Sequence, residues 1–203
     1  MIHFIRDNLK VVSWVLTVAI VLFIIVIGVS RVHAYRAGKA TGALYAAQRL
    51  QAGSADQQKA LEEVADDYSS TPAGRQAMLL SGDILMARGD FTAAQAQFEN
   101  LAKNSKGNNL LKIAAMHKEA AAERAMGKLE DAAKTYLAAA EDPRNLNKED
   151  SFYQAARCYE ELKQYAEAAK FYKKVIESAQ ESGTKLKSEE RLLWLIANGS
   201  ISG

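Results

Sequence analysis

The chain has 203 residues, 25% charged and 49% hydrophobic, which predicts a mostly globular protein rather than a disordered one. The formal net charge is only +2 and charges of both signs are interleaved throughout, which argues against nucleic-acid binding. The single cysteine, Cys158, excludes an intramolecular disulfide, and its apolar surroundings predict a small buried core residue rather than a reactive thiol. Abundant alanine with only two prolines favours helices.

The N-terminal segment predicts a membrane anchor. A tail of ten residues precedes an uncharged run over 11–30, and such a run is long enough to cross a hydrocarbon core of about 30 Å at about 1.5 Å per residue. We therefore predict a transmembrane helix over 11–30, with Trp14 near the headgroup layer. A cleavable signal peptide is the alternative, because Val32-His33-Ala34 resembles a cleavage site. The run exceeds the roughly 7 to 15 apolar residues of a signal peptide, which favours a retained anchor.

Basic residues flank both ends of this run and leave its orientation open. They are Arg6 and Lys10 before it, and Arg31, Arg36 and Lys39 after it. Because the rest of the chain follows the span, we expect a single-pass protein with its N-terminus in the cytoplasm and its body across the membrane.

The body, over 31–187, contains an internal repeat. Three segments align: MARGDFTAAQAQFENL, ERAMGKLEDAAKTYLAAA and YEELKQYAEAAKFYKKVI. Their polar turns start at Gly89, Gly127 and Lys163, which are 38 and 36 residues apart. This spacing is close to the roughly 34 residues of a tetratricopeptide repeat (TPR), a pair of helices joined by a turn.

The aligned segments resemble the TPR pattern position by position. Small residues let the two helices of a pair approach closely, and a large residue four positions further fills the gap to the next pair. The small residues expected in first helices are Gly82, Ala120 and Ala156, those in second helices are Ala94, Ala132 and Ala168, and the large residues are Phe98, Tyr136 and Tyr172.

A weaker unit precedes these three. Helices are expected over 34–51 and 57–68, and Pro72 is expected to end the unit. A first unit is often atypical, because it closes one end of the stack. The residues expected to pack in this unit are Leu44, Ala47, Leu50, Ala60 and Val64.

The C-terminal stretch 188–203 predicts one further helix and a short tail. Ser188 is the expected N-cap, 180–187 the connecting loop and Gly199 the stop. The apolar residues Leu192, Leu193, Leu195 and Ile196 predict that this helix packs on the last repeat. The expected fold class is thus all-α: an N-terminal transmembrane helix, then an α-solenoid of about four TPR-like helical hairpins, then a C-terminal capping helix.

The layout resembles the YfgM-like TPR proteins of the bacterial inner membrane. Two stretches carry the likeness: the basic and aromatic start Arg31-Val-His-Ala-Tyr35, and the terminal helix with its ending Asn198-Gly199-Ser200-Ile201. The resemblance implies a periplasmic body that associates with the secretion translocon or with a membrane-anchored chaperone. The tail before the span is shorter than in that family.

No arrangement of residues predicts catalysis. The histidines His3, His33 and His117 do not have metal-ligand spacing, and no phosphate-binding loop or nucleophile motif occurs. Adjacent acidic pairs such as Glu62-Glu63 do not face each other on a helix. We therefore expect no enzyme, no cofactor and no metal site.

Protein binding is the expected function, because the first helices of a TPR stack line its concave wall. Exposed aromatic, methionine and arginine side chains are typical of adaptable protein-binding surfaces. The predicted groove residues are Tyr45, Arg49, Leu79, Asp83, Met86, His117, Arg124, Tyr153 and Arg157. The partners expected are translocon subunits or a membrane-anchored periplasmic chaperone. The alternative is a scaffold subunit of another envelope or motility complex.

Overall fold

The body of the protein is built from helices. The computed structural model describes residues 9–105, 107–178 and 182–201, and within these ranges every regular element is an α-helix. The predicted tail 1–10 lies almost wholly outside the described residues. The helices are α2 (Leu9–Gln48), α3 (Ala55–Asp67), α4 (Pro72–Arg88), α5 (Phe91–Asn104), α6 (Asn109–Ala125), α7 (Leu129–Glu141), α8 (Lys148–Glu161), α9 (Tyr165–Ser178) and α10 (Gly183–Ala197).

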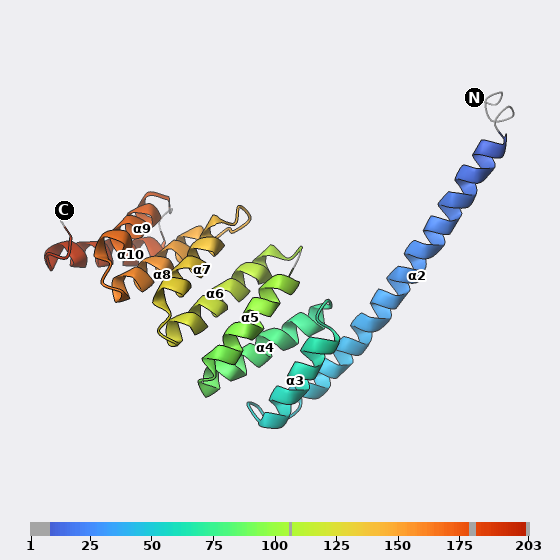
Figure 1. The fold of residues 1–203 in the computed structure, drawn as a ribbon, viewed down its shortest axis with the longest axis horizontal. Helices are drawn as coiled ribbons and strands as arrows, with labels where there is room; N and C mark the ends of the chain where they lie inside the picture. Colours follow the sequence, from blue (N-terminus) through green and yellow to red (C-terminus); the bar gives the residue numbers. More distant parts are fainter. Residues whose placement is uncertain (1–8, 106, 179–181, 202–203) are drawn as a thin grey trace.

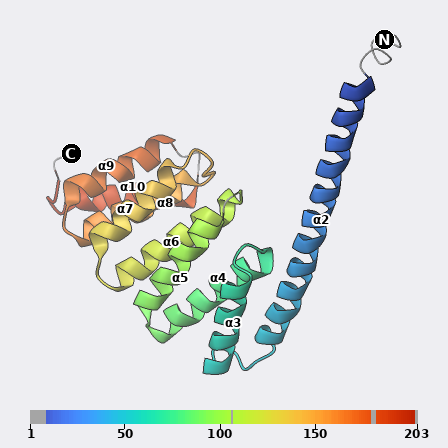
Figure 2. The ribbon, with the colours of Figure 1, turned by 45° about the vertical axis from the view of Figure 1, so that its right-hand side comes forward.

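Consecutive helices pack as antiparallel hairpins that stack in a row (Figure 1). The hairpins are α2–α3, α4–α5, α6–α7 and α8–α9, and α10 packs on α9 and α8 at the end of the row. The N-terminal part of α2 projects away from the stack, as a second view also makes plain (Figure 2). The predicted solenoid of about four hairpins with a capping helix is confirmed.

Close approach of the two helices in a hairpin depends on the small residues. A methyl group added at Gly82 would come within 2.4 Å of the Phe98 ring, which is fully buried. Burying such a ring contributes roughly 1.5–3 kcal/mol. The other predicted small and large residues are buried as well: Ala94, Ala120, Ala132, Tyr136, Ala156, Ala168 and Tyr172.

The predicted turns also lie at the expected positions. Gly89 and Gly127 have positive φ angles of 79° and 76°, a conformation that costs glycine little and that commonly ends a helix. Lys163 holds the same place in the last hairpin with φ 60°, without the freedom of glycine. A left-handed residue with a Cβ costs roughly 1–2 kcal/mol, so the surrounding packing must hold Lys163 there.

The transmembrane and first-repeat helices, predicted over 11–30 and 34–51, form one continuous helix, α2. No proline interrupts 31–39, and Gly38 and Gly42 are tolerated in an otherwise regular helix. By length and composition, α2 contains a stretch long and apolar enough to cross a membrane, and the side chains of that stretch are exposed in the isolated chain.

The first hairpin departs from the prediction at two points. Leu44 and Ala47 are buried as expected, but Leu50 follows the end of α2 and is 40% exposed, so its assignment to the packed face was wrong. Pro72 is the first residue of α4, after the N-cap Thr71, and so begins the second hairpin. In the second helix, Val64 is buried and Ala60 is half-buried.

The start of the capping helix was predicted wrongly. Helix α10 begins at Gly183 with Ser182 as its N-cap, so 183–187 is helix rather than loop, whereas 179–181 lie outside the described residues. Ser188 is buried inside the helix, and its hydroxyl donates a hydrogen bond to the Thr184 carbonyl at 2.8 Å. Two serines six residues apart both suit an N-cap, and the sequence pattern did not separate them. Gly199 ends the helix with positive φ, as predicted.

The apolar residues of α10 divide between two faces. Leu195 is fully buried and Leu192 packs against the same cluster, whereas Leu193 and Ile196 are exposed. The prediction that this helix packs on the last repeat is therefore correct for one face only. The other face of α10 remains apolar and open at the end of the stack.

Gly82→Ala tests the helix contact that repeats through the stack. We expect it to lower the free energy of unfolding by about 1–3 kcal/mol, because the Phe98 ring must shift within a filled core. Gly42→Ala is the matched control, since an added methyl group there meets no atom within 4 Å. It should be neutral or stabilising by up to about 1 kcal/mol through helix propensity. Thermal unfolding followed by circular dichroism measures both, and equal behaviour of the two variants would contradict the packing account.

Candidate functional site

The predicted groove residues all lie on, or directly after, the first helices of the four hairpins. Tyr45 belongs to α2 and Arg49 follows its last turn; α4 carries Leu79, Asp83 and Met86; α6 carries His117 and Arg124; α8 carries Tyr153 and Arg157. We call this set the first-helix face. Its members differ widely in exposure, and this difference determines which of them could touch a partner.

Tyr45 and Arg49 offer the most accessible side chains of the set. The Tyr45 ring is 66% exposed. Leu79 and Met86 are half-buried, and both pack against the cluster that contains Leu85. Tyr153 is different: only 9% of it is exposed, and its ring centroid lies 5.8 Å from that of Tyr172. Tyr153 is therefore chiefly a core residue and presents little surface to a partner.

Asp83 joins two neighbouring hairpins. Its carboxylate accepts a hydrogen bond from the Lys118 ammonium at 2.6 Å, so α4 and α6 are connected by an ion pair. The two residues are 35 positions apart, about one repeat. Both side chains are partly exposed, and a pair in such a setting contributes less than about 1 kcal/mol. It fixes the position of a charge more than it adds stability.

His117 makes the corresponding contact between α6 and α8. Its Nε2 lies 2.7 Å from the Ser151 hydroxyl, and its Nδ1 lies 3.5 Å from a carboxylate oxygen of Asp150. The edge of its ring meets the Tyr136 ring at 5.2 Å. Burial lowers the pKa of His117, and the nearby Asp150 carboxylate only partly opposes that effect. At neutral pH His117 therefore acts as an uncharged hydrogen-bonding group.

Arg124 and Arg157 converge on one carboxylate. The Arg124 guanidinium makes a two-pronged ion pair with Glu161 across the gap between α6 and α8, and one of its bonds, from Nε, is 3.2 Å long. The hydrogen bonds from Arg124 to Glu161 raise the pKa of this arginine further. Arg157 lies 4.0 Å from the same carboxylate. The shared carboxylate leaves the arginine pair with one net positive charge.

These contacts give the first-helix face a second role. Asp83, His117 and Arg124 each bind a residue of the next repeat, so together they hold neighbouring hairpins in register. The partners Lys118, Ser151 and Glu161 were not predicted from the sequence, although their spacing in the sequence indicates them. Each partner lies 34 to 37 residues after the residue it binds, one repeat further along. A search for complementary side chains at the repeat period would have found them.

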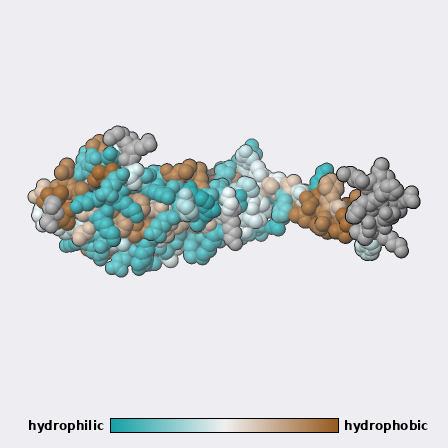
Figure 3. Space-filling view, turned by 90° about the horizontal axis from the view of Figure 1, so that it is seen from above, coloured by the Kyte–Doolittle hydropathy of each residue, from teal (hydrophilic) through white to brown (hydrophobic). Residues whose placement is uncertain are grey.

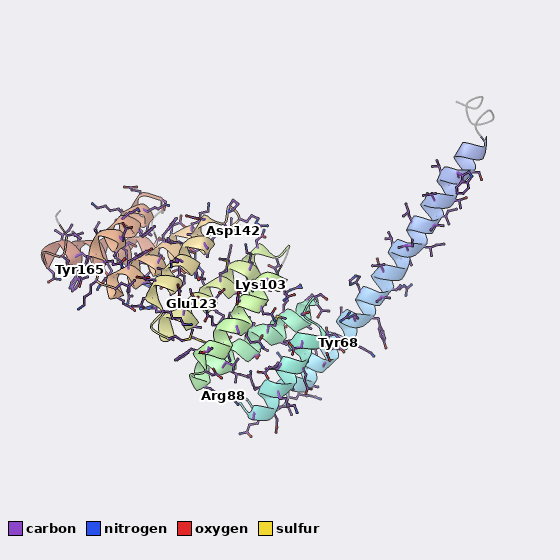
Figure 4. All side chains as sticks on the ribbon, viewed as in Figure 1. Tyr68, Arg88, Lys103, Glu123, Asp142 and Tyr165 are labelled. Atoms are coloured by element: carbon purple, nitrogen blue, oxygen red, sulfur yellow. The ribbon has the colours of Figure 1, made fainter. Side chains whose placement is uncertain are left out.

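A buried carboxylate occupies a position that other repeats fill with apolar residues. Glu123 comes three residues after the small residue Ala120, at the place that Leu85 and Tyr159 take in the neighbouring hairpins. Its oxygens accept hydrogen bonds from the Gln95 amide at 2.8 Å and the Thr135 hydroxyl at 2.9 Å. Burial raises the pKa of Glu123. Its position in Figure 4 is toward the lower end of α6.

Glu119, one turn before Glu123 on α6, is also perturbed. Partial burial, followed by the charges of Glu123 and Glu99, raises the pKa of Glu119 to about 7. Such a group can exchange a proton near neutral pH. Among the described residues, however, no group of three or more His, Cys, Asp or Glu side chains could hold a metal ion. Cys158 is buried as predicted, and burial raises its pKa to about 11, which keeps the thiol protonated.

Two hollows open beside the first-helix face. One, of about 820 Å³, lies between the N-terminal part of α6 and the loop before α8; His117, Lys118 and Asp150 line it, and Leu110 and Leu146 stand at its rim. The other, of about 580 Å³, is lined by Asp83, Leu80, Ile84 and Arg88, among others. Both are large enough to receive side chains of a bound protein segment.

Comparison with known proteins identifies the family. A tetratricopeptide repeat-like domain model matches residues 3–150, and a tetratricopeptide repeat model matches residues 150–182. The chain belongs to the tetratricopeptide repeat-like domain family. Proteins with TPR repeats bind other proteins, and the fold is typically a non-catalytic scaffold. No curated protein matches this TPR chain.

Solved structures agree on the fold. A crystal structure of a putative kinesin light chain from Podosopora anserina, with nearly identical TPR-like repeats, is 19% identical. The match has a TM-score of 0.55 and covers 80% of this chain and 86% of that one. A variant of the same protein, in which one glutamine is replaced by methionine, matches with 20% identity and a TM-score of 0.55, covering 80% and 85%. At this level of identity the likeness concerns the fold of the TPR body alone.

The raised pKa of Glu119 predicts a pH-dependent stability. The unfolded chain releases this proton near the ordinary value of 4.5, whereas the folded protein retains it up to about pH 7. Stability from this group is therefore full below about pH 4.5 and falls as the pH rises to about 7. We expect Glu119→Gln to raise the thermal unfolding midpoint at pH 8 and to leave it unchanged at pH 4.

The control for this prediction is Glu63→Gln, which alters an exposed carboxylate of α3. It should shift the midpoint little at either pH. A Glu119→Gln variant that has the same midpoint as the native protein at pH 8 would refute the pH dependence assigned to Glu119.

Proposed function

We propose that the chain is a membrane-anchored protein-binding adaptor. In this proposal α2 spans the bacterial inner membrane, the N-terminus is cytoplasmic, and the TPR body lies in the periplasm. There it associates with the secretion translocon or with a membrane-bound chaperone. The observation that carries the proposal is the continuity of α2, since one helix contains the apolar run and also forms the first helix of the repeat stack.

The exposure of the apolar run supports the anchor. Its side chains from residue 13 onward are all exposed, and large apolar side chains such as Phe23 and Ile24 are 66% and 62% exposed. A water-soluble protein rarely leaves a continuous apolar surface of this length uncovered. A space-filling view shows the same contrast between the apolar end of α2 and a mostly hydrophilic body (Figure 3).

The first-helix face supports protein binding as the activity. Tyr45 and Arg49 are open to solvent, and further along the same face ion pairs connect α4 with α6 and α6 with α8. A preorganised surface with an exposed aromatic ring loses little conformational entropy on binding. The resemblance to YfgM-like proteins is the reason for naming the translocon and the chaperone as partners.

Protease treatment of intact spheroplasts tests the topology. We expect added protease to digest the TPR body and to leave a protected membrane fragment that contains the apolar run of α2. A cytoplasmic protein detected in the same sample, and resistant until lysis, is the control for membrane integrity. If the body is cut only after lysis, it faces the cytoplasm, and the periplasmic adaptor is ruled out.

Photo-crosslinking tests the partner. A photoreactive residue placed at Tyr45 should crosslink to a translocon subunit or a periplasmic chaperone at native expression, whereas one at the exposed Lys134 of α7 should not. Tyr45→Ala should lower the affinity for that partner by roughly tenfold, because an exposed aromatic anchor typically contributes more than about 1 kcal/mol. Crosslinks from both positions to the subunits of another stable complex would favour the scaffold function instead.

A further inference from the structure

Helix α2 leaves the stack through one defined edge. In each hairpin the first helix begins where the loop from the preceding hairpin ends, so the N-terminal ends of α4, α6 and α8 share one edge. We call the part formed by 68–71, 107–110 and 142–147 the loop edge. Since α2 is the first helix of its own hairpin, its N-terminal extension emerges on the side of this edge. Both ribbon views show the loops pointing to the same side as the N-terminal part of α2 (Figures 1 and 2).

A hydrogen bond sets the height of this edge along α2. The Arg36 guanidinium donates to the Asp67 carbonyl at 2.8 Å, which places the end of α3 beside residue 36. Six residues separate this point from Ser30, the end of the apolar run, and correspond to about 9 Å of helix. The headgroup region on each side of a bilayer is about 5–7 Å thick. The first loop of the edge would thus lie just outside the headgroups if the run spans the bilayer.

Among the described residues outside α2, the two most exposed large apolar side chains lie on the loop edge. Leu146 is 97% exposed and Leu110 is 79% exposed. Both line the hollow of about 820 Å³ described above. Labelled residues in Figure 4 place Lys103 and Asp142 near this edge and Arg88 near the opposite one.

The exposure of Leu146 is built into an ordered loop. The neighbouring Asn145 is buried, and its amide donates to the Ala139 carbonyl at 2.8 Å and to the Ser151 hydroxyl at 3.1 Å. Its side-chain oxygen accepts from the Asn147 backbone N–H at 2.8 Å. Because these bonds hold the loop on both sides, Leu146 cannot turn inward without breaking them. An apolar side chain held outward in this way gains stability only from a surface outside the chain.

Charge at the loop edge is mixed. Residues 103–118 contain four lysines and no acidic residue, whereas 141–150 contain four acidic and two basic residues. The Asp142 carboxylate is neutralised by Arg144 and Lys112, and these partners hold its pKa well below the usual range. The expected contact is therefore made chiefly by the leucines, and we expect it with neutral lipids as well.

We propose that the loop edge rests on the surface of the bilayer that holds α2, with Leu110 and Leu146 inserted among the lipid headgroups. This inference rests on the proposed membrane anchor. The lipid surface is the occupant that the geometry favours, because the helix that forms the first repeat also fixes the distance of the first loop of this edge from the apolar run, and the other two loops point to the same side (Figures 1 and 2). The body then lies along the membrane, held by the span at one end and by the leucines further along.

Site-specific fluorescence in vesicles tests the contact. The full chain is reconstituted in phosphatidylcholine vesicles, and Leu146→Cys carries a polarity-sensitive label. The native Cys158 is fully buried and its pKa is raised to about 11, so it should not compete for the label. Lys128→Cys, in the exposed turn between α6 and α7 at the opposite edge, is the matched control. We expect lipids that carry a quencher on the headgroup to quench the fluorescence of the label several-fold more strongly at residue 146 than at residue 128.

A label in the span separates this proposal from the anchor. Ile20→Cys should be quenched by lipids with a quencher on the acyl chain. If the label at residue 20 is quenched but the label at residue 146 is quenched no more than the label at residue 128, the membrane contact is refuted and the anchor stands. If the label at residue 20 is not quenched, the proposed anchor is refuted, and the proposed membrane contact is refuted with it.

A second variant guards against a disturbance caused by the label. With the label at Leu110→Cys, Leu146→Asp should remove much of the quenching, because it places a charge where an apolar side chain enters the headgroup layer. Lys128→Asp should leave that quenching unchanged. If the label at residue 146 reports an apolar environment only after a membrane protein extract is added, the surface binds a protein and the lipid contact is refuted.

Discussion

The stack depends on one contact, repeated along the chain, between a small residue of a first helix and a large residue of the second. The contact between Gly82 and Phe98 is so close that not even a methyl group fits between them. Once two helices lie this close, their turn must be short and their large residues must face the next hairpin. The row of hairpins follows from that geometry, and no central core is needed. Each hairpin packs against its neighbours in the row.

Much of this architecture could be predicted from the sequence, because close helix contacts restrict which residues can occur at the contact positions. Small residues, large residues and turns recur at a nearly constant period, and all of them were found in the expected places. Prediction failed where the signal was local and ambiguous. Ser182 and Ser188 suit an N-cap equally well, and Leu50 continues an apolar pattern beyond the last turn of its helix. Only the packed chain decides between such choices.

The exposure of the candidate-site residues was harder to predict, for a physical reason. Sequence spacing places a residue on a helix face but does not say whether the neighbouring repeat covers it. Tyr153 has the right register for a binding surface and is nevertheless buried against Tyr172. Asp83 and Arg124 have the right register and hold the adjacent hairpins. Tyr45 is the predicted residue whose ring has most of its surface free. Contacts between repeats thus compete with partners for the same side chains.

The continuity of α2 has a consequence for the rate at which the protein could find a partner. A flexible linker lets a domain explore a volume that grows with its length, and this dilutes the domain. An unbroken helix allows no such freedom, so the body of an anchored chain would stay within a thin layer beside the bilayer. For a partner embedded in the same membrane, the search becomes nearly two-dimensional and the effective concentration high. Modest intrinsic affinity would then be enough for stable association, and a soluble competitor would gain no comparable advantage.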